Sequence, residues 1–122
     1  MKVTLTIDGQ LDGLNNYTRA CRGNKIAGAN MKKHNEEIIG WYIAAQIPDI
    51  HFEGVVELHF RWYEPNRKRD LDNIAFSKKF ILDALVSSGT IKTDSWRGVV
   101  GFTDEFFIDA ENPRIEVDIE EV

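Results

Sequence analysis

The sequence predicts an α+β fold in which a mixed β-sheet of about four to five strands carries two main helices. Three observations favour this fold. Segments with an apolar residue at every second position, typical of half-buried strands, occur at both ends and in the middle of the chain. Segments with apolar residues three and four positions apart, typical of helices, lie between them. At 122 residues, the chain is long enough for one domain, residues 1–122, that buries a core without disulfides.

The first strand is expected in KVTLTID, where apolar and polar residues alternate. Residues 9–30 are rich in glycine and asparagine, which predicts a long loop. A helix is expected to begin with Asn30 as its cap and to end before Pro48. The side chains expected on its packed face recur at three- and four-residue spacing: Met31, His34, Ile38, Trp41, Tyr42 and Ala45.

The segment GVVELHFRWYE predicts the central strand of the sheet, because its apolar residues share one side. These inward residues are Val56, Leu58, Phe60 and Trp62. A second helix is expected to begin near Asp72 or Asn73 and to end at Gly89. Its buried stripe is expected to contain Ile74, Ile81 and Leu85.

Two further strands are expected in RGVVGFTDEFFID and RIEVDIEEV, joined through AENP, with Ile115, Val117 and Ile119 facing inward. The second helix would then connect parallel strands through a right-handed crossover. Such a crossover places the start of the helix at the carboxyl edge of the preceding strand, where α/β sheets favour ligand sites. Asp70 and Asp72 lie at that edge.

Charge is unevenly distributed along this chain of net charge −5. Residues 104–122 hold eight acids and one base, a net charge of −7, so the remainder carries +2. This distribution predicts a basic face on an acidic protein, suited to nucleic acid. The bases gather in these groups: Arg19, Arg22 and Lys25; Lys32 and Lys33; Arg67, Lys68 and Arg69; Lys78 and Lys79.

Other features narrow the function classes. No apolar run is long enough to span a membrane and no signal peptide is expected, so we expect no membrane partner. The single cysteine, Cys21, fits a cytoplasmic location. The three histidines lack the spacing of metal ligands. The acids Glu53, Glu57 and Glu64 are expected to be solvated.

Asp70 and Asp72 interrupt the most basic run of the chain, and two neighbouring acids repel each other unless a cation or hydrogen bond holds them. On a continuous helix, Asp72, Lys79 and Asp83 would share one face, and we expect Asp94 at the same edge of the sheet. Three converging carboxylates would suit Mg²⁺. A structural alternative stays open, in which Asp72 caps the helix, Asp70 pairs with Arg67 or Arg69, and Asp94 opens a turn.

The stretch RDLDNIAFSKKFILDALVSSGTIKTDSW resembles the RusA family of Holliday-junction resolvases. The hallmark of that family is R-D-x-D-N at the start of a helix, then a lysine, D-A-L, a glycine and a final aspartate. The chain supplies Arg69, Asp70, Asp72, Asn73, the DAL tripeptide at 83–85, Gly89 and Asp94. Phe76 occupies the lysine position of the shorter motif, which leaves the lysine as Lys79 or Lys78.

The resemblance implies a RusA-like fold and a homodimeric, Mg²⁺-dependent endonuclease, often encoded by a phage or prophage, that resolves four-way DNA junctions in recombination and repair. One or two Mg²⁺ would be held by Asp70, Asp72 and Asp94, and Lys79 would stabilise charge on the phosphate. The basic residues expected to bind DNA are Arg67, Lys68, Arg69, Lys78, Arg19, Arg22 and Lys25. Two alternatives remain: a catalytically silent junction-binding module, and a broader branched-DNA nuclease.

Overall fold

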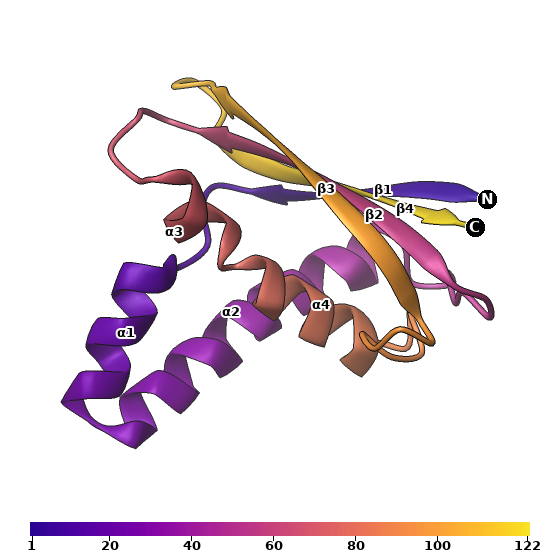
Figure 1. Cartoon of the computed structure of the whole chain (residues 1–122), viewed down its shortest axis with the longest axis horizontal. Coiled ribbons are helices and arrows are strands. Elements are labelled where there is room, and N and C mark those ends of the chain that lie inside the picture. The colour runs from indigo at the N-terminus through magenta and orange to yellow at the C-terminus, as the bar shows by residue number, and fades with distance from the viewer.

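The computed structural model describes residues 1–122. It has a four-stranded sheet with all helices on one side (Figure 1). The elements in chain order are β1 (Lys2–Asp8), α1 (Leu14–Gly23), α2 (Lys25–Gln46), β2 (Val56–Glu64), α3 (Leu71–Ala75), α4 (Lys78–Ser87), β3 (Val99–Ile108) and β4 (Arg114–Glu121).

The sheet is mixed, as predicted, with the strand order β1-β4-β2-β3. β4 pairs antiparallel with both β1 and β2, whereas β3 pairs parallel with β2. The parallel pair confirms the crossover expected through α3 and α4. β3 has a neighbour on one side only, so it is an edge strand.

The core lies between the sheet and the helices, where 22 apolar side chains form one cluster. The alternation predicted for β2 and β4 is confirmed, since the predicted inward residues of both strands are buried. The three residues of the predicted stripe on the second helix, Ile74, Ile81 and Leu85, are buried as well. Gly89 follows α4 with a φ of 78°, which agrees with its predicted role as helix terminator.

The prediction of a long loop at residues 9–30 was wrong, because α1 and the start of α2 occupy most of it. The cap of α2 is Asn24, not Asn30: the Asn24 side chain accepts a hydrogen bond from the backbone N–H of Ala27 at 2.7 Å. Glycine and asparagine here end one helix and begin the next. Their abundance therefore reflects a tight helical hairpin rather than an irregular segment.

The packed face of α2 also differs from the prediction. Its buried residues are Gly28, Asn35, Ile39 and Ile43, while Trp41 is 68% exposed. Asn35 can be buried because its side chain donates to the Asp12 carboxylate and to the Met31 carbonyl, at 2.7 and 2.8 Å. A pattern of apolar residues does not identify a buried asparagine. The prediction therefore set the packed face of α2 a fraction of a turn from its position in the structure.

The helix predicted between Asp72 and Gly89 is broken into α3 and α4. At the break the backbone N–H of Ser77 bonds to the Ile74 carbonyl, three residues back rather than four. The buried Ser77 hydroxyl donates to the same carbonyl at 3.1 Å. A serine that bonds back to its own helix in this way favours a local bend.

No helix of the structure has the length and apolar character needed to cross a membrane.

Candidate active site

The site begins where β2 ends and the chain turns into α3. The turn carries Arg67 and Lys68, which are exposed and form no ion pair. Asp70 takes the N-cap position of α3, and Asp72 lies in its first turn. The carboxyl end of β2 therefore presents the basic run and the two aspartates together, as the sequence predicted.

Arg69 points inward from this turn. Its guanidinium donates to both carboxylate oxygens of Glu64, at 3.0 and 2.9 Å, and to the Leu11 carbonyl at 3.1 Å. Gln10 donates to the same carboxylate at 2.8 Å. Arg69 thus joins the end of β2 to the segment after β1, and it leaves the Asp70 carboxylate unpaired.

The expectation that Glu64 is solvated was wrong, because only 4% of it is exposed. A sequence signal for its burial existed: Glu64 continues the inward series of β2 two positions after Trp62. A buried carboxylate requires a partner, and Arg69 is the cation that supplies it.

Asn73 also points inward and holds the start of α1. Its side-chain oxygen accepts a hydrogen bond from the backbone N–H of Asn15 at 2.9 Å. Gly13 lies so close that a Cβ there would be 2.5 Å from the same oxygen and 2.8 Å from the Asn73 backbone carbonyl. The absence of a side chain at position 13 lets the two segments meet.

Asp70 and Asp72 point outward and are exposed. Neither forms an ion pair, and the only hydrogen bond to either side chain is local, from the backbone N–H of Asn73 to Asp72 at 2.9 Å. Asp70 lines a hollow of about 460 Å³ together with Arg67, Leu71 and Phe107. The structural alternative in which Asp70 pairs with an arginine is therefore not what the structure shows.

Asp94 does not lie at the same edge of the sheet, so that expectation was wrong. In the parallel pair, Val56 at the start of β2 is beside Val99 at the start of β3. Asp94 belongs to the segment that leads into β3, whereas Asp70 follows the end of β2. Two parallel strands share the side of the sheet at which they begin and the side at which they end. The crossover therefore separates Asp94, before the start of β3, from Asp70, after the end of β2.

Asp94 instead contacts Lys79, the exposed lysine at the start of α4. The Lys79 ammonium lies 3.1 Å from Asp83 and 3.3 Å from Asp94. Hydrogen bonding to Asp83, and then to Asp94, raises the pKa of Lys79, so it stays protonated. Lys79 and Asp83 share a face of α4, as predicted, whereas Asp72 lies on the separate helix α3.

Lys78 faces the other way, toward β3. Its side chain is 12% exposed, its ammonium is 2.7 Å from Asp104, and it lies 4.0 Å from the centre of the Phe102 ring. The structure therefore places Lys79, rather than Lys78, on the accessible side of α4.

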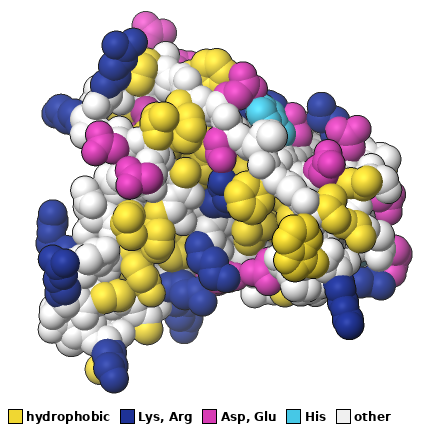
Figure 2. All heavy atoms as spheres, in the orientation of Figure 1, with side chains coloured by type: hydrophobic (Ala, Val, Ile, Leu, Met, Phe, Trp, Pro, Cys, Tyr) yellow, Lys and Arg dark blue, Asp and Glu magenta, His cyan; other side chains and the backbone are white.

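The remaining cations predicted to bind DNA lie on α1 and α2 rather than on the turn after β2. Arg19 and Arg22 are exposed on α1, and Lys25 is exposed at the start of α2. We refer to residues 14–35, which span α1 and the first half of α2, as the basic hairpin. Figure 2 shows Lys and Arg side chains over this part of the molecule, at the lower left.

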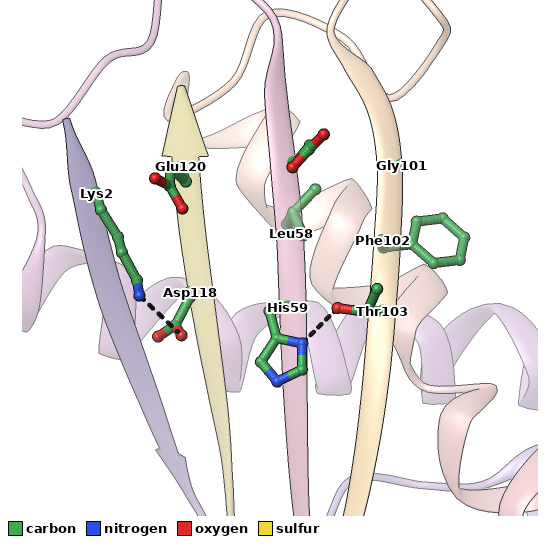
Figure 3. Close-up of a pocket in the computed structure, with 9 residues that line it drawn as sticks. Lys2, Leu58, His59, Gly101, Phe102, Thr103, Asp118 and Glu120 are labelled. Atoms are coloured by element: carbon green, nitrogen blue, oxygen red, sulfur yellow. Dashed lines mark hydrogen bonds and ion pairs between the residues drawn. The ribbon is translucent and has the colours of Figure 1, made fainter. Parts of the chain in front are cut away.

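The opposite face of the sheet is polar and largely acidic. A hollow of about 340 Å³ there is lined by residues of all four strands, among them Lys2, Glu57, Asp118 and Glu120 (Figure 3). His59 bonds to Thr103 and lies 2.6 Å from Glu105. This hollow holds none of the residues predicted for the site.

No group of three or more histidine, cysteine or acidic side chains in the structure is arranged to hold a metal ion. Mg²⁺, however, is commonly bound by one or two carboxylates, with water and substrate phosphate completing its octahedron. Asp70 and Asp72 are unpaired, exposed and on the same turn, which fits that mode. Asp94 does not join them within one chain.

This chain is similar to a known protein family over most of its length. The model described as endodeoxyribonuclease RusA matches residues 14–120, from the start of α1 into the last strand. Among curated proteins, no sequence matches this chain.

Proposed function

This chain belongs to the RusA family of endodeoxyribonucleases, and from that membership we propose that it is a Mg²⁺-dependent endonuclease that resolves four-way DNA junctions. The observation that carries the proposal is the pair of unpaired carboxylates, Asp70 and Asp72, beside exposed cations. Carboxylates gain nothing from standing next to phosphates unless a cation lies between them. We place the activity in DNA recombination and repair, in the cytoplasm of a host, with a phage or prophage as the source.

In this proposal Asp70 and Asp72 hold Mg²⁺, which supplies polarisation of the scissile phosphate and a lowered pKa of the attacking water. Arg67 and Lys68 bind the phosphates on either side and fix the DNA against α3. Arg69 and Asn73 act through position: they attach α3 to β2 and α1, so the two carboxylates keep one orientation.

We propose further that the protein acts as a homodimer and that Asp94 reaches Asp70 and Asp72 of a second copy. Junction resolution requires paired cuts, which a two-fold symmetric dimer can provide. The edge strand β3 supports this arrangement. If two β3 strands meet antiparallel around a two-fold axis, the start of each lies beside the end of the other.

Exposed apolar side chains lie at both ends of β3. Near the start of β3, a hollow of about 510 Å³ is lined by Asp94 together with Trp96, Val100 and Phe102. Near the end of β3, the hollow that is lined by Asp70 is also lined by Leu71, Phe107 and Ile108. Apolar patches of this kind are typical of protein interfaces. One patch lies beside Asp94 and the other lies beside Asp70.

The first experiment is cleavage of a strand-labelled four-way junction and of linear duplex with Mg²⁺, by the natural chain, Asp70→Asn and Asp49→Asn. Asp49 is exposed and forms no ion pair, so it controls for the loss of one charge. We expect paired nicks in the junction only, abolished in Asp70→Asn and unchanged in Asp49→Asn. Equal cleavage of duplex would favour a broader nuclease, and binding without any cut would favour a silent binding module.

A mixing experiment tests the shared site. Asp70→Asn and Asp94→Asn are each expected to be inactive alone. In a mixed dimer, one site would carry both changes and the other would be intact, so mixing should restore nicking of one strand. If both acids served a site within one chain, every site in the mixture would carry a change and no activity would return.

A further inference from the structure

The basic hairpin has a composition unlike the rest of the chain. Residues 14–35 contain five Lys and Arg and no Asp or Glu, in a protein whose net charge is −5. Of the five cations, only Lys32 forms an ion pair, with Asp83 at 3.3 Å. Arg19, Arg22, Lys25 and Lys33 are exposed and have no acidic partner.

The hairpin extends away from the sheet. In Figure 1, α1 and the first half of α2 run to the lower left, beyond the helices that cover the sheet. α1 contains no buried residue and packs on α2 and α3. Tyr17 anchors it, with its ring 5.2 Å from that of Phe76 and 6.0 Å from that of Phe80.

The tip of the hairpin is nevertheless firmly built. Asn24 caps α2, and its own N–H donates to the Ala20 carbonyl at 3.2 Å, closing α1. A Cβ at Gly28 would lie 2.5 Å from the Cys21 sulfur, so the helices meet as closely as a glycine allows. On this tip Ile26 is 71% exposed, next to Lys25.

We propose that the basic hairpin is a second DNA-contacting surface, separate from the carboxylate site, which binds phosphates with Arg19, Arg22, Lys25 and Lys33 and places Ile26 against exposed bases at the branch point. This inference rests on the proposed function, since it names how the same substrate is recognised. Four exposed cations that form no ion pair suit a polyanion. Apolar side chains flanked by cations insert at unstacked base steps, and a branch point offers such steps.

The charge contribution is tested with Arg19→Gln/Arg22→Gln against the matched double variant Lys2→Gln/Lys92→Gln, whose lysines lie outside the hairpin. Binding of junction and duplex is measured in EDTA, so that no cleavage occurs, across a salt series. We expect the hairpin variant to lose about tenfold in affinity for both DNAs and about two units of salt slope. The control should lose neither, and equal behaviour of the two variants would overturn the proposal.

The branch contact is tested with Ile26→Ser against Val122→Ser, an equally exposed apolar residue outside the hairpin. We expect Ile26→Ser to bind the junction about fivefold more weakly and duplex unchanged. An equal effect on both DNAs, or none, would remove Ile26 from the proposal. If the natural chain bound neither DNA, the proposed function itself would fail. If the natural chain bound both DNAs and the hairpin substitutions did not weaken that binding, this inference alone would fail.

Discussion

Between Arg69 and Asn73, some side chains bond to the interior of the protein and others face the solvent. Arg69 and Asn73 bond inward, to Glu64 and to the start of α1, while Asp70 and Asp72 point to solvent. The sequence predicted this stretch as the candidate site, but it did not show which side chains support the fold. Arg69 points inward because its partner, Glu64, is buried. The alternation of β2 predicts this burial only if a charged residue is accepted at an inward position.

The inward role of Arg69 leads to a prediction about stability. Arg69→Met should lower the free energy of unfolding by about 3 kcal/mol, because it leaves the buried Glu64 carboxylate without its cation. The double variant Arg69→Met/Glu64→Met should lose less, since it removes both charges. Urea denaturation measures all three. Arg67→Met, exposed and unpaired, should stay within about 0.5 kcal/mol of the natural chain.

A second prediction at this scale concerns pH. Arg61 donates to Asp118 at 2.8 Å and holds the pKa of that carboxyl far below its usual range. Because the folded pKa is lowered, the stabilisation is complete above the unfolded value of about 3.9 and is lost as pH falls below it.

Asp118→Asn should therefore cost about 2 kcal/mol at pH 7, and the difference from the natural chain should shrink by pH 3. Urea denaturation at both pH values checks this. Glu120→Gln serves as the control, because Glu120 is exposed and forms no ion pair. A difference that persisted unchanged at pH 3 would contradict the assignment of this stabilisation to the ionised carboxylate.

At the scale of secondary structure, elements with a strong apolar period were predictable and those defined by polar contacts were not. The strands β2 and β4 follow from alternation alone. In α1, Leu14, Tyr17 and Cys21 recur at helical spacing, but the glycines and asparagines around them favoured a loop in the sequence. The break at Ser77 depends on a side-chain bond to the Ile74 carbonyl, and propensity does not reveal it.

The close approach within the basic hairpin gives a prediction for these elements. Gly28→Ala should destabilise the protein by about 1–2 kcal/mol, because the new methyl would collide with the Cys21 sulfur. Cys21→Ala should restore most of that loss when combined with Gly28→Ala, since it removes the colliding atom. Thermal denaturation of the two single variants and the double variant gives the coupling. An additive double variant would contradict the contact.

At the scale of the whole molecule, the α+β class and the mixed sheet were predictable, and so was the accumulation of acids at the carboxyl end. The predicted convergence of three aspartates within one chain was wrong, because the helix is divided into α3 and α4 and Asp94 precedes β3 while Asp70 follows β2. One chain places Asp70 and Asp94 at opposite edges of its sheet. A complete carboxylate set is therefore a property of an assembly in our proposal.

Dependence on assembly predicts a concentration effect. Cleavage per mole of protein should fall on dilution, because a dissociated chain lacks a complete site. Val100→Lys, at the exposed edge strand, should shift this fall to higher concentration by about tenfold or more. Sedimentation and junction cleavage over the same dilution series measure both quantities. Specific activity that stayed constant while the protein sedimented as a monomer would argue for a site complete in one chain.

The separation of charge between the acidic face of the sheet and the basic hairpin also affects how the molecule meets DNA. A protein with opposite charge at its two ends has an electric dipole, and the field of a polyanion turns that dipole during diffusion. Repulsion of the acidic face makes encounters on that side short-lived, so productive encounters begin at the hairpin. Orientation would then be selected before any specific contact forms, and the net negative charge limits nonspecific binding elsewhere.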